Sequence, residues 1–436
     1  MSRQKQGIVL LALLLAAMAM VPMVSAAENP TDGVKQNLIE SNYIPVEIAR
    51  EQATITMMEM IRAGALDANW IGAKINPRPQ EIFDINNDRL FYQFSVENKG
   101  KRAGEIYAAA SKVLGGSVIA IGSMNEPDTA KKMQGFSEKA VKENYPGYQV
   151  LSEKTVCFDY PVIGSKVTLK YTKTGEMKDI IIDSRDGSEK KTDSQVSSYY
   201  NQYSAESMKK NIAAWELQNR ILTEKKKKLL AVNPGFFSNY FELDLDKIKT
   251  SFAESGISKI SSDESVEPDG IKVLPMLTHS TQYFGDWCAV ATAQMISSKY
   301  MTPILTPSHP TPWGQYHIGQ MMGAYFPNGN PGAGTTPNME LQYYTASLDN
   351  GGLGKSASFD TYPPYTTWEN AREEIDNLRP LKIGKALPIG HARACNGWFV
   401  TGGNHYLLFY DPASYWSIYW EIVPPESTFG DFVYVR

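Results

Sequence analysis

The chain has 436 residues, of which 42% are hydrophobic and 21% are charged. This composition excludes a wholly disordered protein, and the length suits two or three domains of about 100–200 residues each. The 43 basic and 47 acidic side chains give a net charge of −4, which argues against a nucleic-acid partner because such proteins need a basic face. Three cysteines are too few for a disulfide framework, and five histidines are too few for a metal store.

The N-terminus has the pattern of an export signal. Arg3 and Lys5 precede an apolar run over residues 7–24, and small residues follow up to Ala26. We expect residues 1–26 to be a cleaved signal peptide; the alternative is an uncleaved anchor, since about 18 apolar residues can just span a bilayer. No later stretch is apolar for as long, so we expect a secreted or cell-envelope protein with no membrane span after cleavage.

Residues 27–193 show the alternating patterns of an α+β domain. The stripe of apolar residues over Glu47–Leu66 predicts a helix that Gln52 interrupts. Cys157 lies in an alternating strand pattern, which is typical of a small buried core residue. The further predicted elements are strands at Leu90–Val96 and Val118–Gly122, a helix from Asp128 to Asn144, and strands at Gln149–Asp159, Lys166–Thr172 and Met177–Asp183.

Residues 194–270 connect this domain to the rest of the chain. A long polar helix is predicted over Ser194–Val232, and the lysines of Lys225–Lys228 near its end are typical of a solvated helix C-terminus, with a membrane-surface patch as the weaker alternative. Residues 233–270 are rich in Ser, Pro, Gly and acidic residues, as in an exposed linker that proteases can cut.

Residues 271–436 differ in composition from everything before them. They are about 16% aromatic and 13% charged, against about 8% and 26% in residues 1–270. This change predicts a separate, densely packed domain. A Pro- and Gly-rich stretch at 302–338 is expected to hold one short helix around Gly314–Tyr325.

The most specific chemical signal is the segment TQYFGDWCAVATA over residues 281–293. Cys288 follows a Gly-Asp turn and begins a run of small, helix-compatible residues. The positive end of a helix dipole favours a thiolate, and the unpaired N–H groups of the first turn can hold an oxyanion. Gln282, six residues earlier, could supply a second oxyanion donor. A buried apolar cysteine beside Trp287 is the competing interpretation.

A thiolate nucleophile needs a base, and His405 is the predicted one. It follows Gly402–Gly403 and begins an apolar strand, which places it at a strand end. The remaining histidines are expected to be surface or packing residues: His279, His309, His317 and His391. His391 and Cys395 could also form a metal pair, but no further ligands lie nearby in the sequence.

Two carboxylates compete to orient the imidazole. Asp411 lies six extended residues from His405, about 20 Å away, unless the chain turns there. If Asp411–Ser414 forms a turn and Tyr415–Val423 returns as the paired strand, Glu421 comes back opposite His405. Glu421 is therefore the geometric choice and Asp411 the reserve.

The arrangement of Gln282, Cys288 at a helix start and a His405-led strand far downstream resembles papain-like cysteine peptidases. The bacteriocin-processing (double-glycine leader) peptidase type and its secreted relatives are more similar still, through a helix–strand unit at residues 368–384. The resemblance covers residues 271–436 and implies an N-terminal helix carrying Cys and an antiparallel sheet carrying His. Residues 28–270 resemble, more weakly, the propeptides of streptopain-type peptidases, which implies that they restrain the peptidase until the linker is cut.

The sequence thus predicts an α+β fold with a papain-like catalytic domain preceded by an α+β prodomain. The expected activity is peptide hydrolysis by a secreted zymogen, with Cys288 as nucleophile, His405 as base, Gln282 at the oxyanion and Glu421 as orienting acid. No metal or organic cofactor is expected, and the partners are a protein or peptide substrate and the chain's own prodomain. Ala289 in place of a usual Gly, and the unusual acid, favour an inactive binding module; transglutaminase or peptidoglycan-amidase chemistry is a further alternative.

Overall fold

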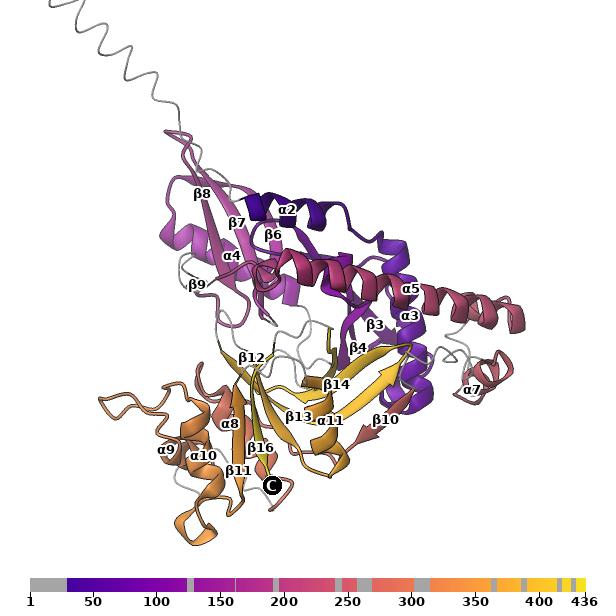
Figure 1. The fold of residues 1–436 in the computed structure, drawn as a ribbon. Helices are drawn as coiled ribbons and strands as arrows, with labels where there is room; N and C mark the ends of the chain where they lie inside the picture. The colour runs from indigo at the N-terminus through magenta and orange to yellow at the C-terminus, as the bar shows by residue number, and fades with distance from the viewer. Residues whose placement is uncertain are drawn as a thin grey trace, which may run out of the picture.

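The computed structural model describes residues 30–123, 129–160, 162–190, 196–239, 245–256, 269–301, 314–361, 367–385, 390–413, 418–424 and 429–436. These residues form a mixed α+β fold around one large sheet (Figure 1). The predicted signal peptide, residues 257–268 of the predicted linker and His309 lie outside them. Among the helices described, none combines the length and the apolar character that crossing a membrane requires.

The N-terminal half begins with two helices and continues mainly as strands, with a 28-residue helix near its end. Its elements are α2 (Pro30–Glu40), α3 (Val46–Ala63), β1 (Lys74–Ile75), β2 (Gln80–Phe83), β3 (Arg89–Asn98), β4 (Lys101–Ala109), β5 (Val118–Ser123), α4 (Thr129–Asn144), β6 (Tyr148–Asp159), β7 (Val162–Tyr171), β8 (Met177–Asp183), β9 (Glu189–Lys190), α5 (Ala205–Val232), α6 (Phe236–Asn239) and α7 (Leu245–Glu254).

Most predicted elements of this half are confirmed, and the departures have local causes. Helix α3 tolerates Gln52 because the buried amide donates to Asn219 of α5 at 2.9 Å. Helix α5 begins at Ala205 rather than at residue 194, because the Ser204 side chain accepts a hydrogen bond from the backbone N–H of Ser207 and caps it there. The elements that were not predicted are α2, β1, β2, β4, β9, α6 and α7. Helix α7 lies within the predicted exposed linker, yet it buries Ile248 and Phe252, so this part of the linker is packed rather than exposed. Cys157 is buried, as expected.

The C-terminal half places a helix group beside the remaining strands (Figure 1). Its elements are β10 (Gly270–Val273), α8 (Cys288–Ser297), α9 (Gln315–Met321), α10 (Pro337–Thr345), β11 (Ala357–Thr361), α11 (Thr367–Asp376), β12 (Leu381–Lys385), β13 (His391–Thr401), β14 (Asn404–Tyr410), β15 (Ile418–Ile422) and β16 (Phe429–Val435). The predicted helix start at Cys288, the short helix near Gly314–Tyr325, the helix near residue 368 and the returning strand after Asp411 are confirmed.

A single sheet runs through both halves. Its order is β11-β16-β12-β13-β14-β15-β5-β4-β3-β2-β6-β7-β8-β9, with β1 beside β3 and β10 beside β13. The junction is the antiparallel pair β5–β15, in which Ile121 lies opposite Trp420. The halves that composition separates are therefore joined by backbone hydrogen bonds.

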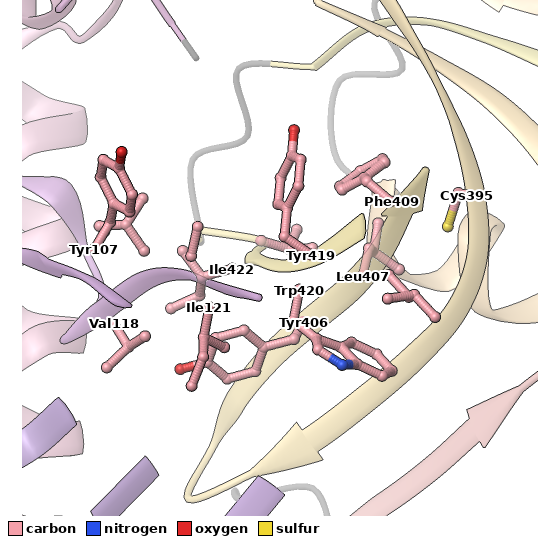
Figure 2. Close-up of a cluster of buried hydrophobic side chains, with 14 of the residues drawn as sticks. Tyr107, Val118, Ile121, Cys395, Tyr406, Leu407, Phe409, Tyr419, Trp420 and Ile422 are labelled. Atoms are coloured by element: carbon pink, nitrogen blue, oxygen red, sulfur yellow. The ribbon is translucent and has the colours of Figure 1, made fainter. Parts of the chain in front are cut away.

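The junction is also a continuous apolar core. Figure 2 shows Tyr107, Val118 and Ile121 on the N-terminal side, facing the buried side chains of β14 and β15. Trp420 reaches across the junction and donates its indole N–H to the carbonyl of Ala65 at 2.8 Å. Burying large apolar side chains on both sides stabilises the contact in proportion to the area removed from water.

One lysine of the run Lys225–Lys228 departs from the predicted solvated helix end. Lys225 is 2% exposed and forms an ion pair with Glu59 of α3. The other carboxylate oxygen of Glu59 accepts a 2.9 Å hydrogen bond from Thr401, at the end of β13. Successive residues of a helix point in different directions around its axis. Lys225 therefore faces α3 and is buried, whereas Lys227 of the same run is exposed.

Replacing Lys225 by Met is expected to lower the free energy of unfolding by about 3–5 kcal/mol, because it leaves the carboxylate of Glu59 buried without a counter-charge. Lys227→Met is the matched control in the same run and should change it by less than about 0.5 kcal/mol. Urea denaturation followed by tryptophan fluorescence measures both. Equal effects of the two variants would contradict the buried pair.

Candidate active site

Cys288 is the first residue of α8 and is partly exposed. Trp287, directly before it, is fully buried and donates its indole N–H to the carbonyl of Ala324 at 3.0 Å. One turn into the helix, Thr292 donates to the carbonyl of Ala392 at 3.0 Å. The Thr292 contact holds α8 against the start of β13, and the Trp287 contact ties the start of α8 to the segment after α9. The thiol therefore lies at the positive end of a fixed helix.

His391 is the first residue of β13 and lies beside Cys288. One ring nitrogen, Nε2, is 2.8 Å from Oδ1 of Asp411, and the ring also has a hydrogen-bonding contact with the Cys288 side chain. Because Nε2 faces Asp411, Nδ1 is the nitrogen left for the thiol. Burial alone would lower the pKa of His391, but the charge and hydrogen bond of Asp411, with the contact to Cys288, outweigh it and raise the pKa to about 10.

Asp411 follows the last residue of β14 and is fully buried. Its Oδ1 also accepts from the backbone N–H of Ala413 at 2.8 Å, and its Oδ2 accepts from the hydroxyl of Tyr419 at 2.9 Å. Burial raises the pKa of a carboxyl group, but the charge of His391, its hydrogen bond and the charge of Arg393 outweigh burial here and lower the pKa of Asp411. Asp411 is therefore held ionised and fixed in orientation.

A two-residue turn brings Asp411 to His391. Gly402–Gly403 has φ values of 58° and 78°, which suit the tight turn of a β-hairpin. From that turn, β13 and β14 pair antiparallel up to Ala394 and Tyr410, with one irregularity on the way. Asp411 therefore emerges at the open end of the hairpin, next to the start of β13. The glycine pair was the signal in the sequence that could have placed these two residues together.

The structure places His405 away from Cys288, contrary to the prediction. His405 pairs with Val400 beside the turn, nine residues along β13 from His391, or roughly 30 Å at the usual strand rise. Its ring stacks on Trp368 of α11, with centroids 4.3 Å apart and an interplanar angle of 6°. The glycines before His405 mark the closed end of the hairpin, whereas Cys288 lies at the open end.

Glu421 is likewise not brought to a histidine. It pairs with Leu407 rather than with His405, and its carboxylate forms a buried ion pair with Arg393. The hydroxyl of Tyr160 donates to the same carboxylate at 3.2 Å. The reserve candidate, Asp411, is the carboxylate that the structure places against a histidine.

Gln282 lines a cavity together with Cys288 and His391. Its side-chain amide donates to two carbonyls of its own turn, those of Phe284 at 2.9 Å and Gly285 at 2.5 Å. In this arrangement the amide holds the turn before Cys288, and the oxyanion role of Gln282 stays a prediction.

The other candidate ligands and bases have different surroundings. Nε2 of His279 contacts the backbone carbonyl of Asp411 at 2.7 Å, and Nε2 of His317 contacts the carbonyl of Gly351 at 2.8 Å. The thiol of Cys395 is buried and contacts the carbonyl of Gly397, and burial raises its pKa to about 12. The part of the chain that the structure describes holds no group of three His, Cys, Asp or Glu side chains suited to a metal.

Two cavities meet at the thiol and the imidazole. One, of about 450 Å³, lies among α8, α10, β12 and residues near Asp431, and the other, of about 540 Å³, lies toward β7–β9 of the N-terminal half. Asp286, Cys288 and His391 line both. An extended substrate could therefore pass from one cavity to the other with a bond held over Cys288.

No family model matches this sequence, and no curated protein matches it. Among solved structures, a crystal structure of UfSP from C. elegans is similar, with 18% sequence identity and a TM-score of 0.27. The match covers 40% of this chain and 36% of that chain, so it spans little more than a third of the neighbour.

The raised pKa of His391 predicts a pH-dependent stability. A histidine in the unfolded chain has a pKa near 6.5, so the folded protein binds this proton more tightly. The resulting stabilisation is complete below pH about 6.5 and is lost as the pH rises through about 10. We expect the urea midpoint to fall over this pH range more steeply in the wild type than in His391→Gln. If the midpoints of the two proteins fell in parallel with pH, the raised pKa of His391 would be contradicted.

Proposed function

We propose that this protein is a thiol peptidase in which Cys288 is the nucleophile, His391 the proton carrier and Asp411 the orienting acid. The observation that carries the proposal is the contact of one imidazole with both a thiol at a helix N-terminus and a buried carboxylate. Such a nucleophile, base and orienting group form the set that acyl-transfer chemistry needs.

The geometry supports a two-step reaction. The Cys288 thiolate attacks the peptide carbonyl, and backbone N–H groups at the start of α8 are placed to stabilise the oxyanion. The C–N bond then breaks as His391 gives its proton to the departing amine, which leaves a thioester. A water molecule gives a proton to His391 and attacks the thioester, so that a carboxylic acid leaves and Cys288 is restored.

Glu421 as the orienting acid was one reason to expect an inactive binding module. That reason does not apply to this site, because Asp411 rather than Glu421 contacts the imidazole of His391. Ala289 is buried in α8 and lines the smaller cavity without separating Cys288 from His391. Transglutaminase and amidase chemistry would use the same three groups, and the substrate distinguishes them from peptide hydrolysis.

The test combines labelling with cleavage on the purified, reduced protein. Iodoacetamide should label Cys288 at least tenfold faster than Cys157 and Cys395, which are both buried and serve as controls within the same chain. The wild type should cleave members of a mixed peptide library, and Cys288→Ala should cleave none. If Cys288 labels quickly but only cell-wall fragments or glutamine–amine pairs react, the acyl-transfer alternatives replace the peptidase.

Export and latency also remain proposals that the sequence supports. The mature N-terminus, read by intact mass, tests cleavage after Ala26. Loss of about 240 N-terminal residues from the wild type but not from Cys288→Ala would support a zymogen. The sheet pairing and the buried contacts between the two halves favour a different role for the N-terminal half.

A further inference from the structure

We infer that the N-terminal half is a permanent part of the active site, holding Asp411 in place and forming one wall of the substrate cleft, rather than a cover that is removed. This inference rests on the proposed peptidase function. It assigns positioning roles to Tyr419, Arg393 and Tyr160, none of which has the chemistry of a nucleophile or base in this site.

Hydrogen bonds connect the imidazole of His391 to Arg393 through Asp411 and Tyr419. The hydroxyl of Tyr419 donates to Oδ2 of Asp411 at 2.9 Å and accepts from Nη1 of Arg393 at 2.8 Å. All three side chains are buried, with exposed fractions of 0–2%. Tyr419 therefore fixes the oxygen of Asp411 that His391 does not contact, and Arg393 fixes the hydroxyl.

Further contacts connect Arg393 to the N-terminal half through Glu421 and Tyr160. Arg393 forms the buried ion pair with Glu421, and the hydroxyl of Tyr160 donates to that carboxylate at 3.2 Å. Tyr160 follows β6, so the last donor in this chain of contacts belongs to the N-terminal half. Because hydrogen bonds and an ion pair link these buried side chains, removing one donor loosens the groups that it holds.

Tyr160 itself is held from the catalytic side. Lys385, at the end of β12, donates to the carbonyl of Tyr160 at 3.3 Å and lies 4.2 Å from the centre of its ring. Lys385 pairs with His391 in the sheet and lines the 450 Å³ cavity. The two halves therefore interlock next to the reacting groups.

The cavity of about 540 Å³ has one wall from each half. Residues 281–286 form one side, and Asp159, Tyr160, Arg185 and Lys190 are among those that form the other. Arg185 and Lys190 are both anchored on the buried carboxylate of Asp183, so this wall is ordered. A removable cover would lie over Cys288, whereas these residues border an open cavity beside it.

The experiment has two arms on the full-length protein. In the first, a specific protease site replaces part of residues 257–268 and is then cut. We expect the two fragments to elute together in size-exclusion chromatography and peptidase activity to remain within about twofold, because the sheet and the buried contacts persist. Separation of the fragments with activity retained or increased would overturn the inference.

The second arm compares Tyr160→Phe and Tyr419→Phe with Tyr200→Phe, whose buried hydroxyl donates to the carbonyl of Arg89 away from the network. We expect kcat to fall about tenfold for Tyr419→Phe and severalfold for Tyr160→Phe, with KM little changed. The pH profile of Cys288 alkylation should also shift in both, but not in Tyr200→Phe, which controls for lost stability.

Unchanged pH profiles in Tyr160→Phe and Tyr419→Phe, with an active wild type, would overturn the inference and leave the peptidase standing. A wild type that neither cleaves peptides nor labels selectively at Cys288 would instead remove the proposed function. The alkylation profile separates these two failures because it reports on the thiol and imidazole without a substrate.

Discussion

Replacing His391 by Gln is expected to reduce kcat/KM for peptide cleavage by about 10⁴-fold or more, since the loss of the base in such a set removes nearly all of its rate enhancement. The amide keeps much of the volume but cannot carry the proton between Cys288 and the leaving amine. Peptide cleavage under saturating and limiting substrate measures the effect.

His405→Gln is the matched control, because it makes the same chemical change on the neighbouring strand. It removes the stacking on Trp368, which is worth about 0.5–1.5 kcal/mol of stability, and should leave kcat/KM within about twofold. If His405→Gln proved the inactive variant and His391→Gln the active one, the assignment of the base would be reversed.

The second large effect is expected at Asp411. Asp411→Ala should lower kcat by about 10²–10⁴-fold, because His391 loses both the charge and the hydrogen bond that orient it. The same change removes the main influence that opposes burial and raises the pKa of His391. The pKa read from the pH profile of alkylation should therefore fall below about 10.

Glu421→Gln provides the comparison for Asp411→Ala. It removes the counter-charge of buried Arg393, so we expect a loss of about 3–5 kcal/mol in the free energy of unfolding. Because Glu421 contacts neither Cys288 nor His391, kcat of the folded fraction should fall by less than about tenfold. A greater loss of activity in Glu421→Gln than in Asp411→Ala would contradict the assignment of Asp411 as the acid that orients His391.

Local signals explain why Cys288 could be predicted. A turn, a cysteine and a run of small residues together define a helix start, and α8 begins at that cysteine. Gln52 and Ser204 show the opposite case, because a buried amide and a cap decide the details of α3 and α5 only once the partner helix or turn is known.

The base was harder to predict because the two ends of one hairpin look alike in sequence. His391 follows Gly390 directly, His405 follows Gly403 with one residue between them, and both precede apolar strand residues. The end of the hairpin that lies against α8 is set by the hydrogen bond from Thr292 to the carbonyl of Ala392. These two residues are 100 positions apart in the sequence. No feature of the sequence near β5 or near β15 indicates that these two strands pair. The change in composition between the two halves instead suggests that the strands belong to separate domains.

The β5–β15 pair also constrains how the chain reaches its native state. It joins residues 118–123 to residues 418–422, about 300 positions apart, and contacts of such long sequence separation form slowly. Until the last strands are synthesised, β5 presents an unpaired, apolar edge, which is prone to pair with the wrong strand. Folding of the whole sheet therefore completes late, and we expect truncations before residue 418 to aggregate.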